Sequence, residues 1–124
     1  MWTAEQLRAI NEDGNLLVSA AAGAGKTAVM TERIARIIAS GTDVSEILVV
    51  TFTNPAAAEM KQRIERRLSE LAESTDDTKL KMHLHDSAIN ISTANISTIH
   101  SFCGNVLRRN CHIVGLDPAF RTAD

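Results

Sequence analysis

Aromatic residues are scarce in this sequence: three Phe and one Trp make up 3% of 124 residues, and there is no Tyr. The core must therefore be aliphatic, and each aromatic position becomes worth locating. Apolar runs are short as well. The run Ile47–Val50 is far below the roughly 20 residues that a membrane-spanning helix needs. The sequence therefore excludes an aromatic-rich core and predicts no transmembrane segment.

Cysteine is rare, and neither sign of charge dominates. The sequence contains only two cysteines, and Met1–Gln6 lacks the basic and apolar character of a signal peptide. Both features favour an intracellular chain with reduced thiols. Thirteen Lys and Arg against 15 Asp and Glu give a net charge of −2, which excludes a strongly basic nucleic-acid coat but allows a local basic face. With 44% hydrophobic residues, the composition is globular and indicates one small domain or a piece of a larger one.

Short β-rich segments alternate with helical ones, which predicts an α/β fold with a parallel sheet of about three strands flanked by helices. The expected strands are Leu16–Val18, Ile47–Phe52 and Asn95–Ile99. Thr3–Gln6 fits a capping box that starts a helix before the first strand.

Four further helices are expected: Lys26–Ala39, Asn54–Ala72, Leu80–Ile91 and His100 to about Asn110. Asn54 is expected at the N-cap of the second, followed by proline. The segment Leu80–Ile91 also alternates like a strand, but the helical repeat covers more residues. Side chains expected to face the core are Met30, Ile34, Ile37, Ile38, Ala57, Met60, Ile64, Leu68 and Leu71.

A glycine-containing turn lies between the first expected strand and the helix after it. It reads Ala20-Ala21-Ala22-Gly23-Ala24-Gly25-Lys26-Thr27, close to the phosphate-binding pattern G-x-x-x-x-G-K-[ST], with alanine for the first glycine. The glycines let backbone N–H groups turn toward phosphate oxygens. Lys26 would reach the β- and γ-phosphates, and Thr27 would bind Mg²⁺. A nucleoside triphosphate site is therefore predicted; a chance Gly-Lys-Thr turn is the alternative.

A second carboxylate, which P-loop ATPases carry at the end of another strand to hold Mg²⁺, is missing from the sequence. The nearest candidate, Val114–Pro118, contains Gly and Pro and is typical of a turn. We therefore expect residues 1–124 to be the amino-terminal part of one ATP-binding domain, ending before its Walker B strand.

Four segments together resemble the UvrD/Rep/PcrA-like superfamily 1 DNA helicases. Trp2–Gln6 is similar to their Q motif and Ala20–Thr27 to motif I, where alanine in place of the first glycine is familiar. Thr51–Lys61 is similar to motif Ia and Thr98–Cys103 to motif Ib. The residues around these motifs are most similar to the helicase–nuclease members of the superfamily, each of which pairs with a second subunit.

The resemblance implies a partial RecA-like P-loop lobe that binds ATP and Mg²⁺. In a longer parent protein it implies an ATP-dependent DNA helicase or translocase with an associated nuclease, active in double-strand break processing and recombinational repair in the bacterial cytoplasm. The implied partners are single-stranded DNA and the second subunit. This chain alone is expected to be inactive, because the later motifs, the second lobe and its arginine finger are absent from it.

Site roles follow from the resemblance position by position. Gln6 would bond the adenine, and Ala20 to Thr27 would hold the phosphates, with Lys26 and Thr27 as catalytic residues and Thr27 on the metal. Ala28 departs from several relatives, which place an arginine against the adenine. The residues that would contact single-stranded DNA are Phe52, Thr53, Asn54, Thr98 and His100, with Phe52 stacking on a base.

The positions of these segments independently favour a ligand-binding edge. Thr51–Asn54 and Thr98–Ser101 each follow an expected strand, and ligands of open α/β sheets gather at the carboxyl ends of the strands. Hydroxyl and amide groups there suit phosphate contacts that position DNA without reading its sequence.

Structural roles stay open for several of these residues. Gln6 could serve only the capping box, Phe52 the core, and His100 a helix cap, while Lys61–Arg67 suits a solvated helix face. Cys103 and Cys111 with the neighbouring histidines do not suit one zinc ion. They lie about two helical turns apart, roughly 12–16 Å along a helix at 1.5 Å per residue.

Three function classes fit the sequence. The first is the ATP-binding part of a DNA motor, and the second is a small complete P-loop kinase or nucleotide hydrolase. The third is a binding module that uses nucleotide only for regulation. The second class requires a Walker B carboxylate, which the sequence lacks.

Overall fold

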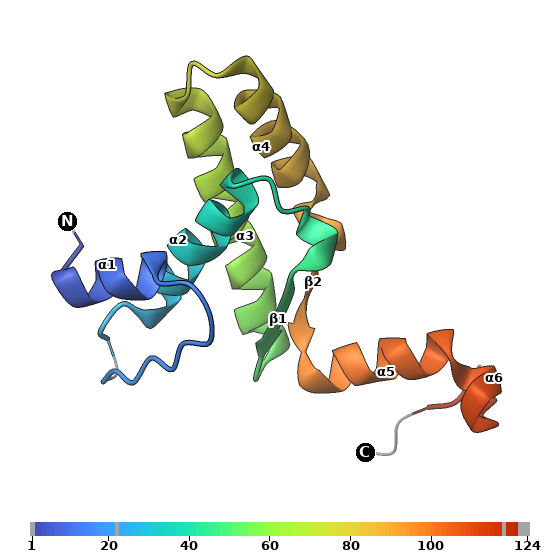
Figure 1. Ribbon diagram of the computed structural model, residues 1–124. Coiled ribbons are helices and arrows are strands. Elements are labelled where there is room, and N and C mark those ends of the chain that lie inside the picture. The colour runs from blue at the N-terminus through green and yellow to red at the C-terminus, as the bar shows by residue number, and fades with distance from the viewer. Residues whose placement is uncertain (1, 22, 118, 122–124) are drawn as a thin grey trace.

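A long helix, α3 (Asn54–Ser74), lies at the centre of the computed structural model, which describes residues 2–21, 23–117 and 119–121. Helix α4 (Thr78–Asn90) runs back beside it as a hairpin, and α2 (Lys26–Ala39) packs on α3 as well (Figure 1). Strands β1 (Leu48–Thr51) and β2 (Asn95–Thr98) also contact α3. All four elements therefore take their positions from one helix.

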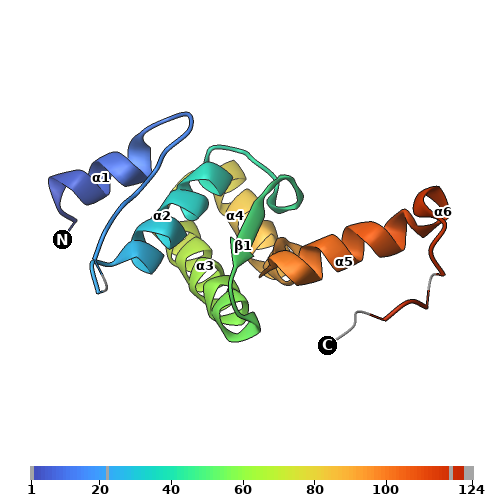
Figure 2. The ribbon, with the colours of Figure 1, turned by 90° about the horizontal axis from the view of Figure 1, so that it is seen from below.

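The remaining elements lie at the two ends of this body. Helix α1 (Ala4–Asn11) packs on α2 at one end. Helices α5 (Ile99–Arg109) and α6 (Cys111–Val114) project from the other, as both views show (Figures 1 and 2). Two short 3₁₀ helices, η1 (Val44–Glu46) and η2 (Ile91–Thr93), precede the strands. Among the described residues, no helix is both long and apolar enough to cross a membrane.

The core is aliphatic, as the scarcity of aromatics predicts. Its fully buried large side chains are Ile38, Ile64, Leu68 and Leu84. The expected inward stripe of α3 is confirmed, apart from Leu71, which is only partly buried beside the fully buried Ala72. On α2, Ile34 and Ile38 are buried as expected, but Met30 and Ile37 are exposed. The buried face of α2 instead includes Thr31 and Ala35, and α2 packs on α3.

Local sequence signals explain where the helices begin. The capping box of α1 is confirmed, with Thr3 as N-cap. Helix α3 has Thr53 and not Asn54 at its N-cap, since the Thr53 hydroxyl accepts the N–H of Ala56 at 3.3 Å. Helix α4 begins after Asp77, whose carboxylate accepts two backbone N–H groups. The helical interpretation of this ambiguous segment is therefore confirmed.

The sheet has two strands in parallel register, in which Leu48 pairs with Asn95 and Thr51 with Thr98. The α/β class holds, but the third expected strand, Leu16–Val18, is not a strand in the structure. Leu17 there has 95% of its surface exposed. An apolar run becomes a strand only when a neighbouring strand accepts its backbone hydrogen bonds, and no described residue pairs with this one.

An ion pair between a buried carboxylate and a half-buried arginine joins α2 to α3. Glu32 is only 6% exposed and receives two hydrogen bonds from Arg67, from Nε at 2.6 Å and Nη2 at 3.0 Å. Arg36 lies 3.7 Å from the same carboxylate. The hydrogen bonds from Arg67 hold the pKa of Glu32 below its usual value, against the opposing effect of desolvation.

The expected solvated face at Lys61–Arg67 is exposed in its middle and only half-buried at its two ends. Arg67 bonds Glu32, and Lys61 donates to the backbone carbonyl of Ser92 at 2.7 Å. Arg63 fits the expectation, because its pairing with Glu59 is exposed. Charge along a helix does not distinguish these cases, since the partners come from distant parts of the chain.

We predict that Glu32→Gln lowers the free energy of unfolding by about 1–3 kcal/mol near neutral pH, because the bonds from Arg67 lose their charged acceptor. The pairing lowers the folded-state pKa, so the contribution of Glu32 is present above its unfolded pKa of about 4.3. It is lost as pH falls through the lower folded value. Urea denaturation across the range from about pH 7 to about pH 3 should show a smaller acid-side loss in the variant.

Glu70→Gln is the matched control, because Glu70 meets the same Arg67 from an exposed position, at 3.2 Å. Its cost should stay below about 0.5 kcal/mol. Equal stabilities and equal acid-side slopes for Glu32→Gln and wild type would contradict a stabilising role for the pair of Glu32 and Arg67.

Candidate functional site

The phosphate-like loop has the backbone that its glycines allow. Gly23 and Gly25 have φ angles of +79° and +80°, a left-handed conformation that costs other residues energy. Gly25 is the N-cap of α2, and the helix begins at Lys26. The first N–H groups of a helix have no acceptor within the helix. The loop thus ends in backbone donors and the positive end of a helix dipole, an arrangement that suits an anion.

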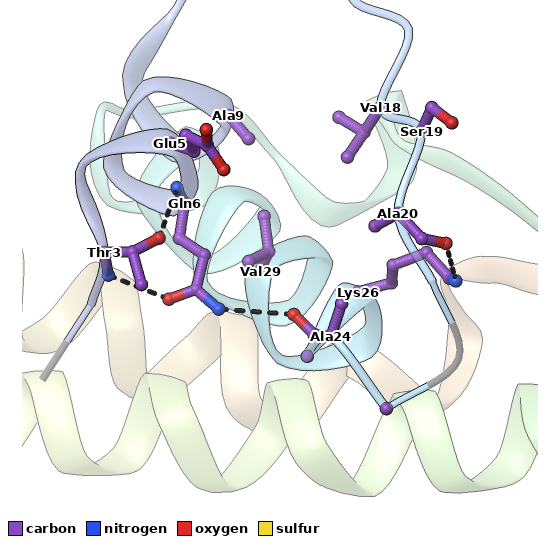
Figure 3. A pocket seen from close by; sticks show the side chains of 12 residues that line it. Thr3, Glu5, Gln6, Ala9, Val18, Ser19, Ala20, Ala24, Lys26 and Val29 are labelled. Atoms are coloured by element: carbon purple, nitrogen blue, oxygen red, sulfur yellow. Dashed lines mark hydrogen bonds between the residues drawn. The ribbon is translucent and has the colours of Figure 1, made fainter.

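Lys26 folds back across this loop. Its ammonium donates to the carbonyl oxygens of Ala20 at 2.6 Å and Ala21 at 3.0 Å, and Figure 3 shows the bond to Ala20. The side chain therefore lies beside the loop with its charge held by backbone oxygens. Thr27, the expected magnesium ligand, is exposed, and its carbonyl accepts the Thr31 hydroxyl at 2.9 Å.

Gln6 connects the capping box of α1 to the loop. Its Oε1 accepts the backbone N–H of Thr3 at 2.9 Å, and its Nε2 donates to the carbonyl of Ala24 at 3.3 Å. Both bonds appear in Figure 3, with Gln6 between Thr3 on one side and the loop on the other. The capping role left open from sequence is confirmed, and a contact to the loop accompanies it.

A pocket of about 510 Å³ lies between α1 and the loop, within the usual range for small-molecule sites. Its charged side chains are Glu5 and Lys26. The lining residues are Thr3, Glu5, Gln6, Ala9, Val18, Ser19, Ala20, Gly23, Ala24, Gly25, Lys26 and Val29. Of the expected nucleotide-binding residues, Ala21 and Thr27 do not line it, and Ala22 lies outside the described residues.

Sequence reasoning missed the apolar part of this pocket. Ala9 and Val29 are buried and form a small core between α1 and α2, with Trp2 packed against it. Helical spacing gives no signal for Val29, because Glu32 and Arg33 stand three and four positions after it. The pocket therefore has one apolar wall, from the α1–α2 contact, and one polar wall, from the loop.

The expected nucleic-acid residues gather at the carboxyl edge of the sheet, because the register sets Thr51 beside Thr98. Phe52 is fully exposed, so the core role left open from sequence is wrong. Thr53, Asn54 and His100 are exposed as well. The edge thus presents one bare aromatic ring among polar groups.

The two threonine hydroxyls at this edge serve as helix caps. The Thr53 hydroxyl caps α3, and the buried Thr98 hydroxyl accepts the N–H of Ser101 at 3.2 Å to cap α5. His100 is therefore not the N-cap of α5. Cys103 and Cys111 are free thiols, and the described residues contain no group of three or more metal-binding side chains.

Comparison with known proteins agrees with the motifs. Residues 2–124 match the UvrD/REP helicase N-terminal domain. The chain is 50% identical over 125 residues to an ATP-dependent helicase/nuclease subunit of Heliobacterium modesticaldum, an alignment that covers 99% of this chain and 9% of the relative. The corresponding protein of Desulforamulus reducens is 50% identical over 127 residues, covering 99% and 10%.

A more distant relative is the corresponding protein of Pediococcus pentosaceus, 44% identical over 124 residues, with coverage of 99% and 10%. The chain thus spans about a tenth of the length of the relatives it matches. The expected resemblance to the helicase–nuclease members of the superfamily is confirmed, at the amino-terminal end of those proteins.

We predict that Gly25→Ala destabilises the chain by about 1–2 kcal/mol, because an L-residue at φ +80° is strained. Its Cβ would also lie 3.2 Å from the Gln6 amide nitrogen. Gly104→Ala is the control: this helical glycine of α5 has ordinary φ, and its nearest neighbour is the flexible end of Arg108 at 3.4 Å. That change should stabilise by about 0.5–1 kcal/mol. The two variants should shift the melting temperature in opposite directions. An unchanged melting temperature for Gly25→Ala would refute the strained turn.

Proposed function

The chain belongs to the UvrD/REP helicase family, and we propose that it forms the ATP-binding portion of an ATP-dependent DNA helicase or translocase. Its residues would be the amino-terminal part of a RecA-like domain that binds Mg²⁺–ATP in the pocket between α1 and the loop. The observation that carries this proposal is the convergence of Gln6, the loop and Lys26 on one pocket.

The chemistry of that pocket supports a triphosphate. Lys26 is the one cation among the described residues that lines it, and its ammonium now bonds two carbonyl oxygens. Phosphate oxygens carry full negative charge, so they would replace those carbonyls as stronger, charge-assisted acceptors. Thr27 follows Lys26 in the first turn of α2, where its hydroxyl would bind Mg²⁺ alongside the β- and γ-phosphates. The bound ion would neutralise the charge that develops on the phosphates during hydrolysis.

The exposed edge of the sheet supports a second ligand, single-stranded DNA. Phe52 offers a stacking surface, and base–aromatic stacking is tolerant of sequence. Asn54 and His100 lie at the starts of α3 and α5, where helix dipoles favour phosphate oxygens. Helix α2, which follows the loop, packs on α3, and so do both strands that carry the edge, so α3 joins the two candidate sites.

In a longer parent protein, the proposal extends to an AddA-type subunit that combines the helicase with a nuclease. It would act in double-strand break processing and recombinational repair beside an AddB-like partner subunit. The relatives are named as one subunit of a helicase/nuclease, which supports both the nuclease and the partner. A cytoplasmic location in a bacterium follows from this role.

We predict that the purified chain binds Mg²⁺–ATP or ADP weakly and hydrolyses essentially none, since an arginine finger alone supplies about 10³–10⁵ in rate. Lys26→Met should abolish binding in isothermal titration calorimetry without lowering the melting temperature. The reason is that the Lys26 ammonium donates to exposed loop carbonyls, which water can bond in its place. The low end of turnover for complete enzymes is about 1 s⁻¹. If the chain hydrolyses ATP faster than this and Lys26→Met does not, the result would instead support a self-sufficient P-loop enzyme.

We predict that Phe52→Ala weakens binding to a labelled single-stranded oligonucleotide by about 1–3 kcal/mol, with less than about 0.5 kcal/mol loss of folding stability. Binding should ignore sequence and fall with salt. Ile89→Ala is the control, because Ile89 is another exposed apolar residue, on α4. Equal DNA affinities of wild type, Phe52→Ala and Ile89→Ala would exclude stacking by Phe52.

A further inference from the structure

We infer that Gln6 orients the phosphate loop itself, in addition to any contact with the base. Phosphate binding would then depend on Gln6 even for a ligand that has no base. This inference rests on the proposed function of the pocket, and it assigns Gln6 the role of a positioning residue for the phosphates.

The first argument comes from the peptide between Ala24 and Gly25. Gln6 Nε2 donates to the Ala24 carbonyl oxygen at 3.3 Å. In a planar trans peptide, that carbonyl and the N–H of Gly25 point in opposite directions. Holding the carbonyl toward α1 therefore turns the Gly25 N–H away from α1. The orientation of one backbone donor at the start of α2 is thus set by a side chain from another helix.

The loop needs such a restraint at this position. Both glycines that flank Ala24 have positive φ, and glycine is the residue with the greatest backbone freedom. The only other bond that holds Ala24 is from its own N–H to the carbonyl of Ala21, at 3.2 Å, among the described residues. Without Gln6, rotation of the Ala24–Gly25 peptide would meet little resistance.

The amide lies directly against this peptide. A Cβ added at Gly25 would come within 3.2 Å of Gln6 Nε2, with no other heavy atom within 4 Å among the described neighbours. The hydrogen bond, drawn in Figure 3, and this short distance both place the Gln6 amide beside the Ala24–Gly25 peptide.

The anchor for this contact is rigid. The Thr3 N–H holds Oε1, so the amide must present Nε2, its donor end, to the loop. Helix α1 is fixed to α2 by the buried Ala9, Ile10 and Val29. A further bond runs from Arg33 of α2 to the Ala9 carbonyl at 2.8 Å. The loop is therefore braced, through α1, against the helix that follows it.

The choice of residue agrees with this role. Glutamate in place of Gln6 would complete the capping box equally well. It would, however, present an acceptor to the carbonyl of Ala24, where only a donor can bond. The capping box requires only an acceptor oxygen at position 6, whereas the bond to Ala24 also requires a donor, which glutamine has and glutamate lacks.

The test uses inorganic tripolyphosphate with Mg²⁺, a ligand that carries phosphates and no base. Calorimetric titration of the purified chain compares wild type with Gln6→Met, which keeps the side-chain length but loses both the donor to Ala24 and the capping acceptor for Thr3. The inference expects tripolyphosphate to bind about threefold to tenfold more weakly to Gln6→Met, the range for one lost hydrogen bond. ATP affinity should fall by at least that factor.

Two further variants separate this effect from lost stability. Asp77→Ala removes the N-cap of α4, away from the loop (Figure 1), and should leave tripolyphosphate affinity as in wild type. Gln6→Glu keeps both capping-box bonds and should melt as wild type, yet bind tripolyphosphate more weakly. Part of that loss comes from the added charge and should shrink at high salt. The part due to the lost Ala24 bond should persist.

The outcomes distinguish the inference from the proposed function. If wild type binds neither tripolyphosphate nor ATP, the proposed nucleotide site itself is refuted. If wild type binds both, and Gln6→Met loses affinity for ATP alone, Gln6 acts only through the base and the inference is overturned. If Asp77→Ala loses as much affinity as Gln6→Met, the effect is one of stability and the inference also fails.

Discussion

The burial of aliphatic side chains around α3 determines where every candidate functional residue lies. Ile64 and Leu68 of α3 are fully buried against the neighbouring helices and strands. Removing such side chains typically costs several kcal/mol, which is a large part of the stability of a small domain. The packing holds α2, and with it the phosphate-like loop, on one side of α3. It holds β1 and β2, whose ends carry the exposed edge, beside the same helix.

Features encoded by neighbouring residues could be predicted from the sequence. The capping box at Thr3, the start of α2 at Lys26 and the glycine turn before it all depend on contacts within a few residues. Strands β1 and β2 were also found, since each has the other as a partner. The glycine turn before α2 is the part of the candidate site that the sequence predicts most directly, because its residues are consecutive, and Gly23 and Gly25 have the positive φ angles that such a turn requires.

Features that depend on distant partners could not be predicted in this way. Leu16–Val18 has the composition of a strand, but composition cannot supply the neighbouring strand that it needs. Arg67 looked like a solvated charge because Glu32, its acceptor, lies 35 positions earlier in the sequence. Phe52 ends a β-rich run, and only the structure shows that its ring is exposed. In each case the deciding contact, or its absence, comes from the packing.

At both candidate sites, some residues fix the backbone and their neighbours face solvent. At the sheet edge, Thr53 and Thr98 use their hydroxyls to cap α3 and α5, which fixes the turns between strand and helix. Their neighbours Phe52 and His100 are then left facing solvent. At the loop, Gln6 caps α1 with its oxygen and restrains Ala24 with its nitrogen, while Lys26 lines the pocket. At both sites, residues at the start of a helix restrain the backbone by hydrogen bonds, and the adjacent side chains are accessible to a ligand. A capping residue in this fold is therefore a positioning residue wherever the helix it starts borders a site.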